Sequence, residues 1–412
     1  IIFARVKEEM TKGKSVRNSL KAGFHKAMSA IVDGNVTTLI AAAVLWFRGS
    51  GSVKGFAQTL AIGIIVSMFT ALVITRMIVY AFYAVGIRSE KLYYRPKKPR
   101  EPINFVGRKA IFFAISLILI AAGFGVAGYN AARGNGAMNY SLEFQGGTST
   151  NVTFDQDYTI DEIDAQIIPV VEEATGDHNV QAQKVEGSNQ IIFKTSTLDL
   201  DAREALDQAL VDNFQVDESL ITFENISSTV SSEMRTDAIV AVAIATVLML
   251  LYIWFRFKDI RFATSAVLAL LHDVLIVALF YAVARISVGN TFIACILTIF
   301  GYSINATIVI FDRIREELKL APKGQDLAYT VNKSITQTLT RSIYTSLTTF
   351  ITIAVLFVMG VSSIREFALP LMVGIVCGAY SSVCVTGPLW YVMKTKIGGK
   401  KKEAEKSGKK KK

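Results

Sequence analysis

The chain has 412 residues, of which 51% are hydrophobic, and its mean hydropathy is +0.40. This composition excludes an ordinary soluble protein of this length and indicates a polytopic membrane protein. The formal net charge of +10 is unevenly distributed, because residues 131–236 contain 19 acidic and five basic residues whereas other basic residues collect in short segments beside apolar runs. The positive-inside rule therefore predicts the basic loops in the cytoplasm and the acidic segment outside.

The first part of the chain, residues 1–90, is predicted to contain the end of one membrane helix, an amphipathic cytoplasmic stretch and two apolar spans. The chain starts at Ile1 in an apolar run, without an initiator Met or the features of a signal peptide. We therefore expect a fragment that begins at the end of a membrane helix. The two spans are predicted at residues 31–48, entered near Asp33, and at residues 56–75.

The rest of the chain is predicted to divide into a linker, an external domain and a second group of helices. The expected boundaries are 91–108 for a cytoplasmic linker rich in proline and charge, 109–130 for an outward-crossing helix, 131–235 for the external domain, 236–395 for a helical bundle and 396–412 for a basic cytoplasmic tail. Apolar spans are predicted at 110–130, 236–255, 262–284, 291–311, 342–360 and 366–393. We expect the lysine-rich tail to lie near anionic lipid and not to bind nucleic acid.

The external segment alternates β-rich runs with polar helical patterns. The runs are TSTNVTF, IDEIDAQIIPVVEEA, HNVQAQKV, NQIIFKT, LDAREALDQALVDNF and LITFENI. Their order, β-α-β-β-α-β, predicts a ferredoxin-like α+β domain. His178 is expected to be a surface residue and not a metal ligand. The predicted fold is thus a polytopic α-helical membrane protein with an external ferredoxin-like domain, which we interpret as a binding or coupling module.

An internal repeat relates the two helical parts of the chain. FARVKEE at residues 3–9 aligns with FDRIREE at residues 311–317, and TTLIAAAVL at residues 37–45 aligns with TTFITIAVL at residues 348–356. An even number of predicted crossings separates the copies, so they share one orientation. We therefore predict a pseudo-two-fold axis along the membrane normal, with the functional site between the two halves.

The polar residues inside the apolar spans are candidate site residues, because such groups are costly in hydrocarbon. Asp273 is expected near the bilayer centre, either as a proton-carrying carboxylate with His272 as a possible partner or as a structural acid bonded to a neighbouring helix. The three cysteines are expected to be packing residues without disulfides: Cys295, Cys377 and Cys384. No metal site is predicted.

A second set of candidates lies on the span at residues 291–311 and on the one that follows it. Thr298, Tyr302 and Asn305 share one helical face, which must look at other helices or at water. Arg341 precedes a threonine-rich span and is either functional or placed at the cytoplasmic edge. The acid Asp33 is open to the same two interpretations, and Asp312 with Arg313 is expected to form an ion pair or a charged cluster at a helix end.

The sequence contains no phosphate-binding loop, because KGKS at residues 12–15 lacks the upstream glycine of that motif. We therefore expect no ATP hydrolysis. We also predict that the protein is not an enzyme and needs no cofactor. Work across the membrane would draw on an ion gradient, in which one charge moved through 100 mV yields about 2.3 kcal/mol.

Several stretches of the chain resemble SecDF, the fused SecD and SecF proteins of bacterial protein export, which are related to the resistance-nodulation-division transporters. The matching stretches, in family order, are VKEEMTKG, VDGNVTTLI, VKGFAQTLAIG, SMFTA, YSLEFQGGT, LHD, LTIFGYSIN, IVIFDRIREE and TQTLTRSIYTSLTT. The resemblance implies that residues 1–90 are the last part of a SecD half and that residues from about 105 to 395 form a SecF half.

The resemblance also implies a function. It suggests an accessory subunit of the Sec translocase in the bacterial plasma membrane that uses the proton-motive force to promote protein export. The implied partners are the Sec channel, its associated membrane insertase components, the lipid bilayer, and unfolded preprotein at the external domain. Arg341 matches a family arginine that, together with an acid, is thought to serve proton passage, and Asn305 matches the asparagine that directly precedes this acid.

The chain departs from the family pattern at one position of the expected proton pathway. The family has an acid after the asparagine of LTIFGYSIN, whereas this chain has Ala306. An alanine cannot carry a proton or pair with Arg341. Either another acid such as Asp273 takes this role, or proton coupling is altered, or the residue was substituted by design.

Two further function classes remain open from the sequence. One is a proton-driven exporter of small molecules or lipids from the resistance-nodulation-division superfamily, and the other is a scaffold that stabilises the Sec channel without transport. An exporter should present a large apolar external cleft, whereas the external segment is acidic and poor in aromatic residues. This composition favours the export accessory.

Overall fold

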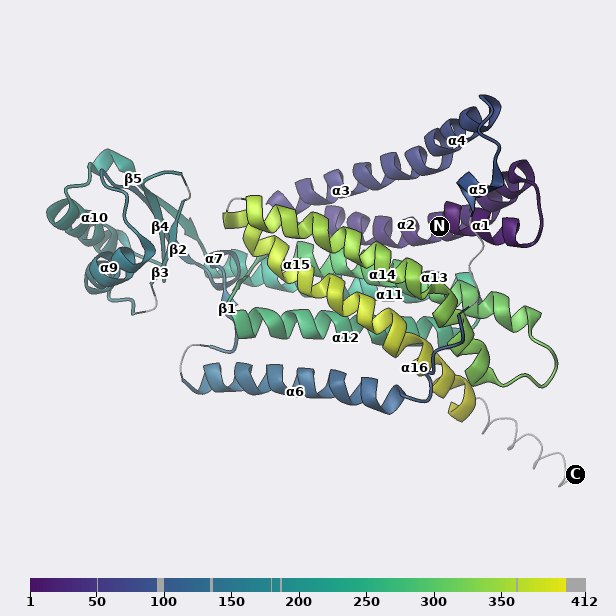
Figure 1. Ribbon diagram of the computed structural model, residues 1–412. Coiled ribbons are helices and arrows are strands. Elements are labelled where there is room, and N and C mark those ends of the chain that lie inside the picture. Colours follow the sequence, from purple (N-terminus) through teal and green to yellow (C-terminus); the bar gives the residue numbers. More distant parts are fainter. Residues whose placement is uncertain are drawn as a thin grey trace, which may run out of the picture.

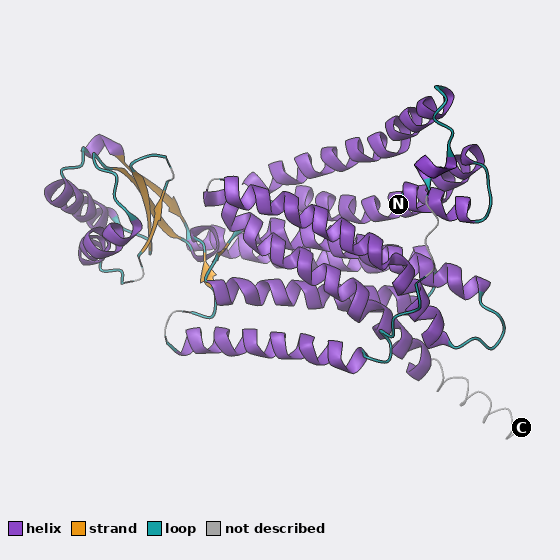
Figure 2. Cartoon of the chain, viewed as in Figure 1, coloured by secondary structure: helices purple, strands orange, loops and turns teal. Residues whose placement is uncertain are grey.

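A computed structural model of the chain describes residues 1–49, 51–94, 100–133, 136–178, 180–185, 187–360 and 362–397 (Figure 1). Long helices lie side by side in one bundle, and a small sheet domain protrudes from one end of it. Figure 2 shows that the strands are confined to this domain and to its junction with the helices. Most of the predicted basic tail, 396–412, lies outside the described residues.

Eight helical segments in the described part of the chain are long and apolar enough to cross a membrane, as the sequence predicts. They are built from α2 (Val16–Arg48), α3 (Gly51–Phe69) with η1 (Thr70–Ile74) and α4 (Thr75–Ala84), α6 (Lys109–Ala132), α11 (Ser228–Phe257), α12 (Ile260–Ala284), α13 (Asn290–Leu320), α14 (Leu327–Met359), and α15 (Ser362–Tyr380) with η4 (Ser381–Thr386), α16 (Gly387–Val392) and η5 (Met393–Ile397). The shorter helices α1 (Ile2–Thr11) and α5 (Glu90–Tyr93) lie at the end of the bundle away from the sheet domain.

Two helices begin well before the apolar spans that the sequence predicts. α2 begins at Val16, so Asp33 lies inside a continuous helix and not at its entrance. α14 begins at Leu327, and Asp326 caps it by accepting hydrogen bonds from the amides of Ala328 and Tyr329. In both helices the polar and apolar parts share one uninterrupted backbone, because no proline or cap residue separates them.

The last membrane segment contains a π-helical stretch, η4, followed directly by Gly387 and Pro388. Proline has no backbone N–H, so the regular α-helical hydrogen bond to the carbonyl four residues earlier cannot form. A wider π-helical turn is one way in which a helix accommodates this loss, and such turns are frequent at functional sites. The first residue of η4 is Ser381, which belongs to the polar cluster described below.

The sheet domain, residues 147–226, is a ferredoxin-like sheet covered by helices, as its sequence predicts. Its elements are β2 (Gly147–Thr153), α8 (Ile160–Glu162), η2 (Ile163–Ile167), α9 (Ile168–Thr175), β3 (Gln181–Lys184), β4 (Gln190–Thr195), α10 (Leu200–Phe214), η3 (Glu218–Leu220) and β5 (Ile221–Ile226). The strand order is β3-β4-β2-β5 and every pair is antiparallel. Alternate side chains of the strands, including Val152 and Phe193, pack with Ile167 and Leu206 of the helices in a core of their own.

A short stem joins this domain to the helical bundle. It consists of β1 (Asn139–Tyr140), α7 (Leu142–Gln145), Gly146, and Gly147, which is also the first residue of β2. β1 pairs in parallel with β6 (Ser287–Val288), which connects α12 to α13. The side chain of Phe144 on α7 is buried in the main core of the helical bundle.

Within the described residues, α13 is the most buried of the eight candidate membrane segments, and it contacts α2, α12, α14 and α15. α2 and α13 approach closely at two glycines. A Cβ atom at Gly34 would collide with the side chain of Asn305, and one at Gly301 would collide with Thr38. These contacts form the seam between the two repeated halves, which we define as the packed surface of α1 and α2 against α13.

Candidate functional site

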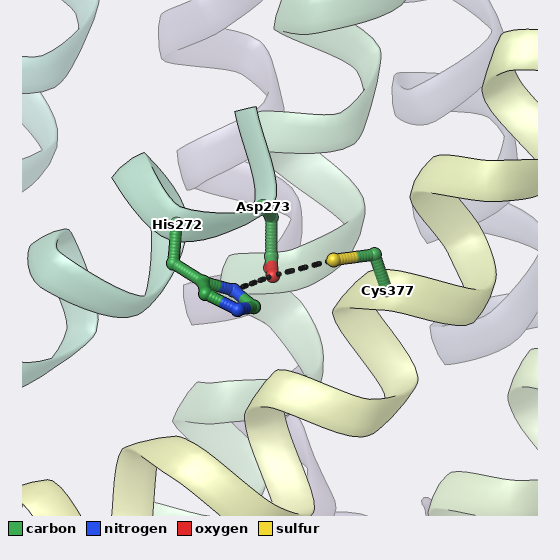
Figure 3. Close-up of side chains that lie close together, drawn as sticks. All are labelled: His272, Asp273 and Cys377. Atoms are coloured by element: carbon green, nitrogen blue, oxygen red, sulfur yellow. Dashed lines mark hydrogen bonds and ion pairs between the residues drawn. The ribbon is translucent and has the colours of Figure 1, made fainter. Parts of the chain in front are cut away.

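Asp273 lies at the middle of α12 and is fully buried. Figure 3 shows its carboxylate between the ring of His272 and the sulfur of Cys377. His272 Nδ1 is 2.9 Å from Oδ1, and the Cys377 thiol donates to the same oxygen at 3.2 Å. The hydroxyl groups of Ser303 on α13 and Ser381 on η4 donate to Oδ2 at 2.5 and 2.7 Å. Three helical segments therefore place hydrogen-bond partners around one carboxylate.

The hydrogen bonds around Asp273 suit this cluster to hold a carboxylate or a proton more than a metal ion. Hydrogen bonds to both oxygens stabilise a buried carboxylate, and they also provide a route along which a proton can be exchanged. Asp273, His272 and Cys377 offer three potential metal ligands within 4.8 Å of one another, but the hydroxyl groups already occupy the second oxygen of the carboxylate. Cys377 was expected to be a packing residue only; it is buried, and it is also a hydrogen-bond donor to Asp273.

Arg341 lies on α14 between the amphipathic and the apolar part of that helix, on the opposite side of α13 from Asp273. α14 begins at Leu327, so Arg341 lies inside a continuous helix, directly before the apolar span predicted at 342–360. Arg341 lines a cavity of about 240 Å³ together with Tyr302, Asn305 and Ala306. A neighbouring cavity of about 290 Å³ is also lined by Arg341 and reaches Arg5, Asp312 and Arg313.

α13 thus presents two different polar faces. Tyr302 donates a hydrogen bond to Ser346 of α14 at 2.7 Å, on the face that contains Asn305 and Ala306. The adjacent residue Ser303 points to Asp273 on the other side. Asp273 does not line the Arg341 cavity. The two candidates therefore form separate clusters with one helix between them.

Asp33 takes part in an ion pair between the two halves of the chain. Its Oδ2 atom is 2.6 Å from Nε of Arg256 on α11, and Tyr252 donates to Oδ1 at 2.9 Å. Ser29, one turn earlier on α2, donates to the same carboxylate at 3.1 Å. This nearly buried acid is thus paired with a cation from another helix and does not contact Arg341.

The repeated charged motifs meet across the seam and exchange ion pairs. Arg5 pairs with Glu316 at 2.9 Å, and its repeat equivalent Arg313 pairs with Glu8, the repeat equivalent of Glu316, at 3.1 Å. Asp312 lies 3.6 Å from Arg5. The expected cluster of charges at this helix end is therefore present, but Asp312 pairs with Arg5 across the seam instead of with the adjacent Arg313.

The glutamate that follows Glu8 is almost completely buried. Glu9 accepts charge-assisted hydrogen bonds from Lys12, Lys14 and Lys26 at 2.9, 2.5 and 2.7 Å. The hydrogen bond from Lys14, followed by that from Lys26, lowers the pKa of Glu9 well below its usual range, because each bond favours the charged carboxylate over the protonated acid. Its repeat equivalent Glu317 pairs with Lys333 at 2.8 Å.

Sequence reasoning missed several residues of these clusters. Tyr252, Arg256, Ser303 and Ser381 make the hydrogen bonds of the two buried acids, yet each belongs to a different part of the chain from its partner. A serine in an apolar helix carries little signal on its own, because it can bond to its own backbone. The arginine at the end of α11 was visible only as part of a basic loop.

The chain matches a family of known membrane proteins along most of its length. The family model described as protein export membrane protein SecD/SecF, C-terminal, matches residues 1–85 and 206–396. SecDF from Brucella abortus is 34% identical over 394 residues, which is 94% of this chain and 50% of that protein. SecF from Petrotoga mobilis is 34% identical over 294 residues, which is 70% of this chain and 94% of that protein.

A solved structure agrees with these relatives. The crystal structure of SecDF from Thermus thermophilus, described as a translocon-associated membrane protein, has a TM-score of 0.81 and 34% identity, and the match covers 96% of this chain and 52% of that one. The chain spans about half the length of the curated SecDF relatives it matches. The fold, the ordered motifs and these matches agree, and the chain belongs to the SecD/SecF family of protein export membrane proteins.

Proposed function

We propose that this chain is part of an accessory subunit of the bacterial Sec translocase, and that the protein uses the proton-motive force to promote export across the plasma membrane. Relatives of the chain are named protein translocase subunits SecDF and SecF. The proposal needs no enzymatic activity and no cofactor, because the proton gradient supplies the free energy. Its partners are the Sec channel, associated insertase components and an unfolded preprotein.

The charge distribution supports one orientation in the membrane. The external domain is acidic, and basic residues gather in the loops at the opposite end of the bundle, where α1 and α5 lie. The positive-inside rule then assigns residues 131–235 to the outside and the basic loops and tail to the cytoplasm. In this orientation the external domain is positioned to meet a preprotein as it emerges.

The observation that carries the proposal is the polar face of α13 that looks toward α14, next to the seam between the repeats. Arg341 lines one cavity with Asn305 and Ala306, and that cavity adjoins a second one that reaches the exchanged ion pairs. Polar residues inside a membrane bundle are typical of ion and proton pathways. We propose that protons pass along this face, and that Asp273 on the other side of α13 is the carboxylate that holds a proton in place of an acid at Ala306.

The direct test measures translocation of a preprotein into inverted membrane vesicles from a strain that lacks its own SecD and SecF. With this protein present, an imposed proton gradient should increase translocation, and Arg341→Gln should remove most of that increase. Thr352→Ala, at an exposed position of α14 that does not line either cavity, is the matched control and should keep it. If the gradient has no effect on translocation with the natural sequence, the proposed function is wrong.

A further inference from the structure

The stem, residues 139–147, fastens the external domain to the helical bundle, and one of its side chains holds the end of the most buried helix. Figure 1 shows β1 and α7 at the junction between the sheet domain and the helices. Glu143, in the middle of α7, accepts a hydrogen bond from the backbone amide of Asn290 at 2.9 Å. Asn290 is the first residue of α13.

α13 depends on this bond because its own N-terminal residue offers no cap. The preceding residue is Gly289, which has no side chain to satisfy the free amides of the first turn. A side chain could not be accommodated there, since a Cβ atom on Gly289 would collide with Ser141 and would lie 2.8 Å from the carboxylate of Glu143. A carboxylate at this position also interacts favourably with the helix dipole.

The stem itself is firmly attached to the bundle. β1 pairs in parallel with β6, the strand just before α13, and the amide of Ser141 donates to the carbonyl of Val288 at 3.0 Å. Phe144 is buried in the core shared with α11, α12 and α13. α7 is therefore attached to the N-terminal end of α13 as well as to the sheet domain.

On its other side the stem leads directly into the sheet. Gly146 and Gly147 have φ angles of +79° and +138°, which L side chains rarely adopt. β2, an interior strand of the sheet, starts at Gly147. A second contact joins the sheet to the stem, because Gln181 of β3 donates to Asn139 at 2.6 Å. A displacement of the sheet therefore reaches Glu143 within a few residues.

We infer that Glu143 is a positioning residue that couples the external domain to α13, the helix that contains Tyr302, Asn305 and Ala306. The inference rests on the proposed function, since it concerns how proton passage along α13 is linked to the external domain that would meet the preprotein. In this scheme a shift of the stem displaces the carboxylate of Glu143 and with it the first turn of α13. A shift of α13 in turn displaces the stem, and through Gly146 and Gly147 it reaches β2.

The test compares Glu143→Ala and Glu143→Gln with a matched control in the same protein. Glu162 also accepts a hydrogen bond from the amide at the start of a helix, Thr159 at 2.8 Å, but it lies in the external domain away from the stem. Glu162→Ala therefore removes the same kind of cap without touching α13. Translocation and proton flux are measured in the same vesicles, and hydrogen exchange is followed at residues 290–293.

Loss of the cap should uncouple the two processes. In Glu143→Ala the gradient-dependent part of translocation should fall by about fivefold or more, within the usual range of coupling between sites, while proton flux stays close to that of the natural sequence. Exchange of the first-turn amides of α13 should rise by about tenfold, as for loss of a typical helix cap. Glu143→Gln keeps an acceptor and should restore most of the translocation, and Glu162→Ala should leave coupling unchanged.

Two results would overturn the inference. One is unchanged gradient-dependent translocation in Glu143→Ala. The other is a parallel fall of translocation, proton flux and protein amount, which would mean that Glu143 only stabilises the fold. A lack of gradient-dependent translocation with the natural sequence would instead overturn the proposed function, and hydrogen exchange at residues 290–293 separates that failure from a failure of the cap itself.

Discussion

Asp273 is a buried carboxylate in the middle of α12, and its hydrogen-bond partners are His272, Ser303, Cys377 and Ser381. Because Ser303 and Ser381 donate to Oδ2 and Cys377 donates to Oδ1, an amide in place of the carboxylate would direct an N–H group at one of these donors. We expect Asp273→Asn to destabilise the protein by about 1–3 kcal/mol, the usual cost of an unsatisfied buried polar group. Thermal unfolding in detergent measures this change.

The same substitution tests the proton-holding role of Asp273. Unlike a carboxylate, an amide side chain does not take up and release a proton, so Asp273→Asn should lower proton flux in vesicles. Ser265→Ala is the control, since it removes a buried hydroxyl of the same helix that bonds only to the backbone carbonyls of Arg261 and Phe262. Undiminished flux in Asp273→Asn would exclude Asp273 from the proton pathway.

Ala306 lies beside Arg341 in the cavity on the opposite face of α13. Ala306→Asp would place an acid within reach of the guanidinium, and a nearby cation favours the charged carboxylate. We expect this substitution to increase proton flux and to make the flux sensitive to pH in the range where the new acid titrates. Ala306→Asn has nearly the same volume and no charge, so equal flux in the two variants would contradict a role for an acid at this position.

At the scale of elements, the packing of α2 on α13 depends on glycines that permit close approach. Gly34→Ala should push α2 away from Asn305 and destabilise the protein by about 1–3 kcal/mol, as overpacking of a tight interface does. Gly63→Ala on α3 is the matched control, because no atom lies within 4 Å of its added Cβ and alanine favours a helix. The melting temperatures of the two variants are compared with that of the natural sequence. An equal change in Gly34→Ala and Gly63→Ala would contradict the tight contact at Gly34.

The buried Glu9 joins α1 to α2 through Lys14 and Lys26. Its lowered pKa means that its contribution to stability is complete above the pKa of the unfolded chain and is lost as the pH falls toward the folded pKa. Glu9→Gln should therefore lower the free energy of unfolding by about 1–2 kcal/mol at pH 7. Measured below the ordinary glutamate pKa of 4.5, the difference from the natural sequence should shrink. A difference that is constant over this range would contradict the assignment.

The arrangement of whole elements also shows how much the sequence could predict. The order of strands and helices in the external domain follows from alternating and helical periodicities, which are local properties of the chain. The positions at which α2 and α14 begin were not predicted, because polar residues at the end of a membrane helix look like a loop when only hydropathy is considered. Asp326 caps the start of α14, whereas Ser15 makes no side-chain cap hydrogen bond at the start of α2.

At the scale of the whole molecule, the two repeats meet along one seam and exchange charged partners. Arg5 and Arg313 are equivalent in the repeat, and each pairs with a glutamate of the other copy. Swapping the two residues, with Arg5→Glu and Glu316→Arg, tests whether this ion pair holds the halves together. Arg5→Glu alone should reduce stability, and adding Glu316→Arg should recover about 0.5–1 kcal/mol of it, as measured by a double-mutant cycle. Strict additivity would contradict direct pairing.

The function class is also tested on the whole molecule. A described cavity of about 720 Å³ lies among α6, α12 and α15 and is lined mainly by apolar residues. It lies within the helical bundle and not in the external domain.

Deletion of the protein should reduce secretion of exported proteins and leave sensitivity to small toxic compounds unchanged. Increased drug sensitivity with normal secretion would favour the exporter, and a proton-inactive variant that still supports secretion would favour the scaffold.

The sequence by itself determined the membrane class, the eight spans, the ferredoxin-like domain and the internal repeat, because each depends on composition or on periodicity along the chain. Only the tertiary structure decided which polar residues meet. Asp273 is surrounded by donors from α13, α15 and η4, whereas Arg341 lies on the other face of α13. Contacts between residues far apart in sequence depend on how helices pack, and hydrophobic periodicity defines the face of a helix but not the partner that covers it.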